Sequence, residues 1–262
     1  MKCERCRLVL PLVVCAMAAG GQCIDPVEYG HDDGVGTFTI GPSKWDANMI
    51  WMNSFDAVAG GEMITTVRVS FGGIEDNSGV LGSDEVRIGI LNDPTDDNDP
   101  SDAVLIGGGV GVWEDAGFSE FLDFEIEPVA VDGVFYVAIE MDVLQRANPA
   151  RMDPDSVTAG TRSWLMYHDG PNLDDVGSSL FLLKMSDSPF LGAWMVRAIG
   201  ERACVADMTG DGALDFFDVS AFLSAFSSGE ACGDFNGDGG FDFFDVSAFL
   251  GAFSAGCEDG NP

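Results

Sequence analysis

The pattern of apolar and polar residues separates the chain into a long region that predicts strands and a short region that predicts helices. Within residues 24–200, apolar and polar residues alternate over short runs, as in Thr66–Phe71, whose apolar side chains share one face. Residues 134–141 are apolar at nearly every position, which predicts a central strand. The remaining candidate strands are Thr37–Ile40, Asn48–Phe55, Val86–Ile90, Leu122–Ile126, Ser163–Tyr167, Leu180–Met185 and Trp194–Ile199.

Turns rich in glycine, aspartate, asparagine and proline separate these strands, and the region shows no sustained apolar period of 3.6 residues. Many short strands joined by such turns are typical of a two-sheet antiparallel β-sandwich, here of jelly-roll type, over residues 21–200. One turn, Asn92–Asp102, carries five aspartates. Because these acids show no fixed ligand register, a hydrated surface turn is favoured over a calcium site.

A helical period replaces the alternation after a short polar linker, Ile199–Ala203. Residues 215–227 and 242–254 match at 12 of 13 positions, and in each copy apolar residues recur with the spacing i, i+3, i+4 and i+7. These residues are Val219, Phe222, Leu223 and Phe226 in the first copy and Val246, Phe249, Leu250 and Phe253 in the second. The spacing predicts two short amphipathic helices, which we expect to pack together because neither can bury its apolar face alone.

An acidic 12-residue loop precedes each helix: loop 1 is Asp207–Asp218 and loop 2 is Asp234–Asp245. Residues with side-chain oxygen atoms recur at alternate positions, and a glycine at position 6 allows a sharp turn. Calcium takes about six to eight oxygen ligands, so the pattern predicts two Ca²⁺ sites. The expected ligands, at positions 1, 3, 5, 7, 9 and 12, are Asp207, Thr209, Asp211, Ala213, Asp215 and Asp218 in loop 1 and Asp234, Asn236, Asp238, Gly240, Asp242 and Asp245 in loop 2.

Two features of these loops distinguish them from common EF-hand loops. Position 12 is Asp rather than the Glu common in EF-hands, and both loops continue through Asp-Phe-Phe-Asp-Val-Ser-Ala-Phe-Leu. The duplicated loop–helix unit resembles a type I-like dockerin, and with its flanking cysteines it resembles the dockerin-like repeats at the C-termini of secreted bacterial proteins. For residues 201–262 the resemblance implies a small all-α, paired EF-hand-like module. It also implies a cohesin-like or cell-envelope protein as the partner.

The resemblance also implies roles for individual loop residues. Thr209 stands where dockerins usually carry Asn or Asp, and because a neutral hydroxyl is a poorer ligand, loop 1 is expected to hold the weaker site. Positions 10 and 11, which help select the cohesin in many dockerins, are Phe216–Phe217 and Phe243–Phe244. We interpret one Phe of each pair as a core residue and the other as a partner contact. Burial of all four is the alternative.

The net charge narrows the range of partners. The chain has 44 Asp and Glu residues against 12 Lys and Arg, which gives a formal charge of −32. Nucleic acids are excluded as partners because their binding requires a basic surface. Some carboxylates are expected to bind cations and the rest to form a hydrated acidic surface. With 46% hydrophobic residues, the chain is expected to fold rather than to stay disordered.

Residues 1–20 have the pattern of an export signal. A basic start is followed by an apolar run, Leu8–Ala19, that is too short to span a bilayer and contains small residues for cleavage. A lipoprotein signal is the competing interpretation because Cys23 follows closely, but Gln22 stands where such a signal needs a small residue. We therefore expect a secreted or extracellular protein, with attachment at the cell surface as one option and no transmembrane segment in the mature chain.

Cleavage of this signal would leave four cysteines, Cys23, Cys204, Cys232 and Cys257. Four cysteines in an exported protein indicate disulfides, and three pairings are open. We favour Cys204–Cys257, which would clasp the two ends of the C-terminal module. Cys23 and Cys232 are then left to pair with each other.

The β-domain carries no clear catalytic motif. It lacks a Gly-x-Ser-x-Gly elbow, and its two histidines, His31 and His168, do not form a metal-ligand spacing. We therefore favour a non-catalytic domain that the C-terminal module anchors to its partner. No catalytic residue and no organic cofactor are assigned.

Two alternatives remain open for the β-domain. Jelly rolls often bind polysaccharide, and the tryptophans that could stack on sugar rings are Trp45, Trp51, Trp113, Trp164 and Trp194. We expect most of them in the core and Trp45, beside a Gly-Pro turn, at the surface. The other alternative is a polysaccharide-degrading glycoside hydrolase, because dockerins commonly accompany such enzymes. That activity would require a pair of catalytic carboxylates.

Overall fold

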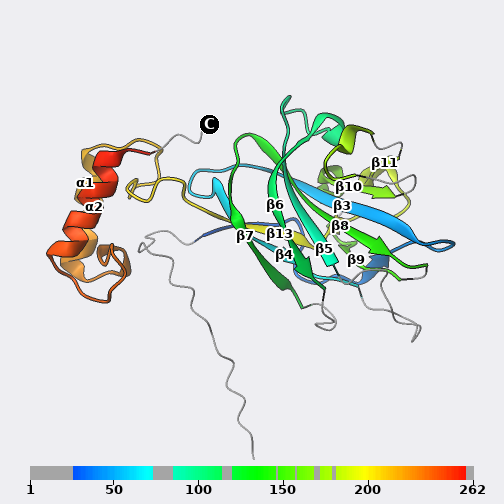
Figure 1. Cartoon of the computed structure of the whole chain (residues 1–262), viewed down its shortest axis with the longest axis horizontal. Helices are drawn as coiled ribbons and strands as arrows, with labels where there is room; N and C mark the ends of the chain where they lie inside the picture. The colour runs from blue at the N-terminus through cyan, green and yellow to red at the C-terminus, as the bar shows by residue number, and fades with distance from the viewer. Residues whose placement is uncertain are drawn as a thin grey trace, which may run out of the picture. The chain divides into compact units, whose positions relative to one another are not determined.

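A computed structural model of the chain describes residues 26–72, 85–113, 120–145, 147–156, 158–167, 172–178 and 181–257. Residues 1–20, which we expect to be an export signal, lie outside these described residues, as do Cys23 and His168. The chain forms two units. One unit contains the strands and extends to Cys204, and the other contains both helices and runs from Val205 to Cys257, apart from residues 210–212. Figure 1 shows the strands and the pair of helices.

The strands of the first unit form three sheets, and every strand pair in the described chain is antiparallel. The four-stranded sheet has the order β1 (Val27–Tyr29), β13 (Val196–Glu201), β4 (Met63–Val69) and β7 (Leu122–Ala130). The six-stranded sheet has the order β11 (Leu182–Lys184), β10 (Ser163–Tyr167), β3 (Ala47–Asp56), β8 (Val134–Val143), β5 (Glu85–Asn92) and β6 (Val104–Val112). The three-stranded sheet has the order β12 (Ala193–Trp194), β9 (Ala150–Asp153) and β2 (Phe38–Ile40).

Short 3₁₀ helices lie between some of these strands and between the two α-helices. They are η1 (Pro100–Asp102), η2 (Thr158–Arg162), η3 (Val176–Ser178), η4 (Met185–Asp187) and η5 (Ala231–Gly233). The α-helices are α1 (Phe216–Ser228) and α2 (Phe243–Ala255). The predicted order of antiparallel β structure followed by two C-terminal helices is thus confirmed.

The six-stranded sheet is buried on both faces near its centre. Alternate residues of β3 point to opposite sides, so that Trp51 belongs to one hydrophobic cluster while Ile50 and Met52 belong to another. The first cluster combines β3, β5 and β8 with β4 and β7 of the four-stranded sheet. Burial on both sides explains why β8, which pairs with β3 and β5, is apolar at nearly every position. The prediction of a central strand there is confirmed.

Two predicted strands are shorter than expected. The segment Trp194–Ile199 divides between β12, which pairs with β9, and β13, which pairs with β4. Between them the N–H of Met195 donates to Arg151 and its carbonyl accepts from Ser70, so the chain passes from one sheet to the other at this residue. β11 covers only Leu182–Lys184, because η4 begins at Met185, and Leu180 lies outside the described residues.

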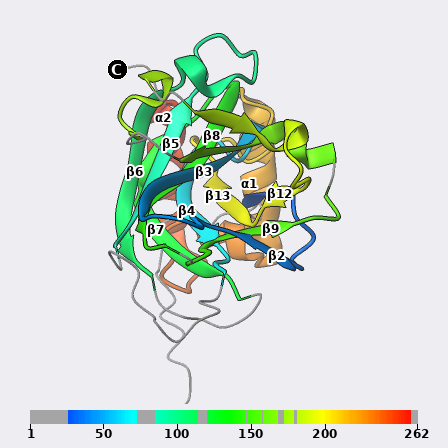
Figure 2. The same ribbon diagram turned by 90° about the vertical axis from the view of Figure 1, so that its right-hand side faces the viewer.

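Strands β1, β6 and β9 were not predicted. β6 has no apolar alternation because it is rich in glycine. It lies beside β7 (Figure 2). A Cβ atom added at Gly107 would lie 2.4 Å from a methyl group of Val129, and one added at Gly111 would lie 2.3 Å from the Phe124 ring. The glycines therefore let side chains of β7 pack directly on the backbone of β6.

The second unit is built on two stacked aromatic rings. Phe222 of α1 and Phe249 of α2 lie with ring centroids 4.2 Å apart and planes 5° from parallel, and both side chains are fully buried. Each helix begins with a capping box, in which Asp215 or Asp242 caps the first turn. The prediction of two amphipathic helices that pack together is confirmed.

We expect Gly111→Ala to destabilise the β unit by about 1–3 kcal/mol, because the new methyl group overlaps the buried Phe124 ring. Val110→Ala is the matched control, since Val110 lies on the same strand with 66% of its surface exposed. That change should alter stability by no more than about 0.5 kcal/mol. Urea unfolding followed by tryptophan fluorescence measures both. Equal stability of the two variants would contradict the packing of β7 on β6.

Candidate metal centre and exposed aromatic surface

Loops 1 and 2 have the same backbone conformation. Position 6 has a φ of 80° at Gly212 and 84° at Gly239, and position 4 has a φ of 73° at both Gly210 and Gly237. Such angles favour glycine, because a side chain in this left-handed region meets its own backbone. The predicted turn at position 6 is confirmed in both loops.

The aspartate at position 12 ties each loop to the helix that follows it. Asp218 and Asp245 are fully buried at the third residue of α1 and α2. Asp218 accepts hydrogen bonds from the N–H groups of Asp215 at 2.9 Å and Thr209 at 3.0 Å. Asp245 accepts the equivalent pair from Asp242 at 2.9 Å and Asn236 at 3.2 Å. Each carboxylate therefore connects positions 3, 9 and 12 of its loop.

Position 1 provides the second inward-facing carboxylate. Asp207 is 4% exposed, and Asp234, which is half-buried, accepts the N–H groups of Asp238 at 3.1 Å and Gly239 at 2.8 Å. The two loops differ at position 3. The hydroxyl of Thr209 lies within hydrogen-bonding distance of Asp207 (3.2 Å) and Asp218 (3.1 Å). In loop 2 the side-chain N–H of Asn236 donates to the Asp238 carboxylate at 3.1 Å, and its amide oxygen accepts the Asp238 N–H at 2.9 Å.

The aspartate at position 9 caps the helix that follows in both loops. Asp215 and Asp242 each accept a hydrogen bond of 2.7 Å from the N–H two residues later, at Phe217 and Phe244. These bonds are the N-caps of α1 and α2, and substitution of such a cap costs about 1 kcal/mol. The two aspartates expected as ligands at position 9 therefore also start the helices.

The buried aspartates at position 12 keep their negative charge. Burial acts to raise the pKa of Asp218, but the N–H groups of Asp215 and Thr209 outweigh it, so that this pKa is lowered. The pKa of Asp245 is lowered in the same way, against its burial, by the N–H groups of Asp242 and Asn236. Residues 203–262 contain no Lys or Arg. Because buried charges are normally paired or bound to a metal, this hard-oxygen donor set fits a cation such as Ca²⁺.

Another group of acids lies in the turn after β5. Among the described residues, one group of three acidic side chains has ligand oxygens within 4.8 Å of one another, namely Asp93, Asp97 and Asp102. Three carboxylates of loop 1 or loop 2 do not come as close in the structure. The turn itself is not simply hydrated as expected, because Asp93 is only 4% exposed. Asp93 accepts hydrogen bonds from three backbone N–H groups, at 3.2, 2.9 and 2.8 Å, and from the Tyr136 hydroxyl at 3.1 Å.

We call the phenylalanines at positions 10 and 11, one pair at the start of α1 and one at the start of α2, the exposed aromatic surface. Phe216 and Phe243 are 76% and 75% exposed, and Phe217 and Phe244 are both 66% exposed. The interpretation that one of each pair packs inside is therefore wrong, and so is the alternative that all four are buried. At about 100° per residue, Phe216 and Phe217 lie roughly 120–140° around α1 from the buried Phe222. Capping thus places both residues on the outer side of the helix.

Loop 2 supplies a core residue that was not predicted. Phe235, at position 2, is 6% exposed and packs edge-on against Phe222 and Phe249, with centroids 5.9 and 5.5 Å away. Met208, at position 2 of loop 1, is also buried. The sequence signal for this burial was an apolar residue at position 2, between the expected ligands at positions 1 and 3, in both loops. Leu223, by contrast, was expected in the core and is half exposed.

The cysteines and tryptophans were predicted in part. Cys204 and Cys257 form the favoured disulfide. Cys232 is half-buried and free, and Cys23, its expected partner, lies outside the described residues. Of the five tryptophans, Trp45 alone is exposed, at 51%, as expected within the described chain.

The chain matches no protein-family model and no curated protein. Neither α1 nor α2, nor any other helix in the described part of the chain, has the length and hydropathy needed to cross a membrane.

We expect Phe222→Ala to destabilise the helix pair by about 3–5 kcal/mol, because it removes one of the two stacked core rings. Phe216→Ala is the matched control on the same helix and should change stability by no more than about 0.5 kcal/mol. Hydrogen exchange of peptides from residues 219–228 and 246–255, followed by mass spectrometry, reports local opening. Equal protection in the two variants would contradict the assignment of core and surface phenylalanines.

Proposed function

We propose that this chain is a secreted, non-catalytic protein that is anchored through its C-terminal module. The module binds two Ca²⁺ ions and holds the β unit on a cohesin-like or cell-envelope protein. The observation that carries the proposal is the exposed aromatic surface, Phe216, Phe217, Phe243 and Phe244, on a chain with a net charge of −32. Exposed apolar groups on a small module mark interaction sites, and here an exposed Phe pair stands at the start of each helix.

The aromatic surface suits association with an apolar partner surface. Phe rings dominate interface energetics because each buries a large area at a low cost in side-chain entropy. Leu223 and Leu250, which are 50% and 47% exposed, add apolar area on the same helices. In α1 and α2 the charged residues are Asp218 and Asp245, and both are buried. Docking on these helices would therefore desolvate no exposed helix charge, and its affinity would depend little on salt.

Calcium supplies the positive charge that the module lacks. Asp207, Thr209, Asp211 and Asp218 would hold one ion and Asp234, Asn236, Asp238 and Asp245 the other, with the carbonyls of Ala213 and Gly240 as further donors. Asp215 and Asp242, at position 9, complete the two ligand sets and also cap the helices. An ion bound in each loop compensates the buried charges of Asp218 and Asp245, so metal binding adds directly to the folding free energy of the module.

We also infer that the four- and six-stranded sheets form a β-sandwich of jelly-roll type. The shared hydrophobic cluster supports this, because it joins Val67 and Val129 of one sheet to Ile90 and Val137 of the other. A β unit of this kind serves here as the anchored cargo.

For calcium, the test is isothermal titration of the full chain with each position-12 aspartate replaced in turn. The wild type should bind two Ca²⁺ ions, and Asp218→Asn and Asp245→Asn should each lose one binding event or weaken it at least tenfold. Glu230→Gln is the control, because Glu230 is an exposed acid of the same unit outside both loops. Two unchanged binding events in both aspartate variants would contradict the proposed sites.

For the partner, the test is capture of cohesin-like or envelope proteins on the immobilised full chain, with calcium or with chelator. Capture should require calcium and should be lost when all four surface phenylalanines are changed to Ser. The matched control is Val110→Ser with Val112→Ser, which alters exposed apolar residues of β6. Capture that persists in chelator and in the four-Phe variant would exclude the anchoring function.

A further inference from the structure

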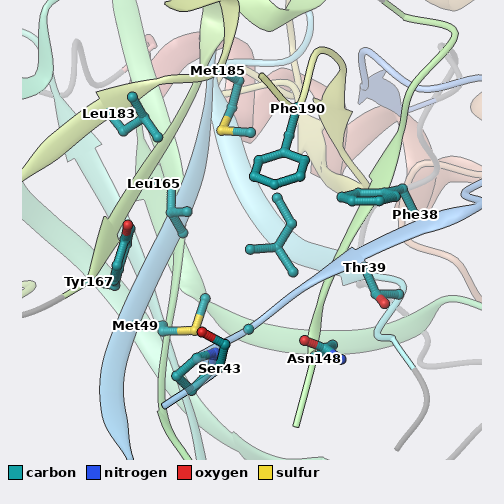
Figure 3. Close-up of a pocket in the computed structure, with 13 residues that line it drawn as sticks. Phe38, Thr39, Ser43, Met49, Asn148, Leu165, Tyr167, Leu183, Met185 and Phe190 are labelled. Atoms are coloured by element: carbon teal, nitrogen blue, oxygen red, sulfur yellow. The ribbon is translucent and has the colours of Figure 1, made fainter. Parts of the chain in front are cut away.

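A cavity in the β unit opens between β2 and the edge formed by β10 and β11 (Figure 3). Its volume is about 320 Å³, within the range of about 300–1,000 Å³ that is typical of small-molecule sites. The lining residues come from β2 with the turn after it, from β3, from the loop before β9, from β10, and from β11 with η4 and the loop that follows it. Strand edges from two different sheets thus enclose the space.

The cavity has a buried floor and an exposed rim. Met49, Leu165 and Met185 form the floor and are at most 3% exposed. Phe38 and Phe190 stand at the rim, 38% and 44% exposed, with their rings stacked at a centroid distance of 5.3 Å. In Figure 3 these two rings lie on the side of the cavity opposite Leu165 and Tyr167. An apolar surface therefore runs from solvent into the core.

Three of the four exposed aromatic side chains in the described part of the β unit line this cavity or pack against its lining. Among the described residues of the unit, the exposed aromatic side chains are Phe38, Trp45, Phe181 and Phe190. Phe38 and Phe190 line the cavity, and Phe181 packs edge-on against its lining residue Tyr167 at 4.7 Å. Trp45 follows two residues after Ser43, which also lines it. Such a concentration marks a binding surface more specifically than one exposed ring does.

The lining is uncharged although the chain is strongly acidic. None of the described residues around the cavity is Asp, Glu, Lys, Arg or His, and the polar side chains there are Thr39, Ser43, Asn148 and Tyr167. An ionic ligand would find no counter-charge in this site. The hydroxyl groups of a sugar would press against Met49, Leu165 and Met185, and each group left without a hydrogen bond costs about 1–3 kcal/mol. The lining therefore favours an apolar ligand.

The two rim rings leave no slot for a ligand between them. A planar ring inserted between Phe38 and Phe190 would need about 7 Å between their centroids, twice a contact distance of about 3.5 Å. The observed 5.3 Å leaves no such slot. The two methionines of the floor are flexible and adapt to the shape of a chain.

We propose that this cavity binds the acyl chain of a small uncharged amphipathic molecule. The chain lies on the floor formed by Met49, Leu165 and Met185, and the polar end of the ligand meets the hydroxyl and amide groups of Thr39, Ser43 and Asn148. This site is independent of the calcium loops and of the aromatic surface on the helices. It gives the β unit a ligand of its own.

The test uses the full chain in calcium with the neutral dye N-phenyl-1-naphthylamine, whose fluorescence rises in apolar surroundings. Saturable binding at one site with micromolar affinity is expected, together with displacement by monodecanoylglycerol and none by cello- or chito-hexaose. Phe190→Asp should weaken dye binding at least tenfold. Leu191→Asp is the matched control, because Leu191 is 42% exposed and adjacent but does not line the cavity, and it should change affinity less than twofold.

Two further variants separate loss of the cavity site from dye binding elsewhere and from loss of stability. Binding must persist when Phe216, Phe217, Phe243 and Phe244 are changed to Ser, which removes the other apolar surface. Phe38→Ser provides a second rim change if Phe190→Asp lowers the melting temperature. The proposal is overturned by dye binding that depends on the helix phenylalanines, by indifference to both rim changes, by the absence of saturable binding, or by displacement with an oligosaccharide.

Discussion

Buried aspartates that accept backbone N–H groups are the interaction on which both units depend. In the β unit, Asp93 organises the turn after β5, and Asp153, 1% exposed, accepts from Asp33 and Asp155. In the helix pair, Asp218 and Asp245 do the same between loop and helix. With 12 basic residues for 44 acids, the chain cannot pair its carboxylates with cationic side chains. Oriented N–H groups take the place of those partners.

The two units differ in how far basic side chains also offset the charge of their carboxylates. The β unit contains arginines that offset part of its negative charge, as when Arg197 binds Glu28 and Asp32. The helix pair has no Lys or Arg at all. Backbone dipoles orient and stabilise a carboxylate, but they do not cancel its charge. The carboxylates of the C-terminal unit are therefore stabilised by hydrogen bonds without any basic side chain of that unit to offset their charge.

Local sequence patterns predicted the structure correctly where the neighbours that determine a residue's conformation lie close to it in the chain. The left-handed glycines at position 6, the start of each helix and the central strand β8 all follow from spacing and turn chemistry. The pattern failed where another segment decides the outcome. Glycine at position 107 of β6 reflects packing by Val129 of β7, and the division of Trp194–Ile199 reflects a change of partner sheet at Met195. Neither partner is visible from the local sequence.

The tetrapeptide Asp-Phe-Phe-Asp has a consequence that reaches beyond the separate residues. Its two aspartates form the capping box of the helix and occupy positions 9 and 12 of the loop. Its two phenylalanines are exposed and belong to the aromatic surface. No flexible spacer separates these parts, so the position of the rings is set by the same backbone that positions the carboxylates. Helix capping and exposed aromatic rings thus come from one four-residue segment that occurs twice. A substitution at an outer aspartate would therefore shift the rings, and with them the partner contact that we propose, although no ring had been altered.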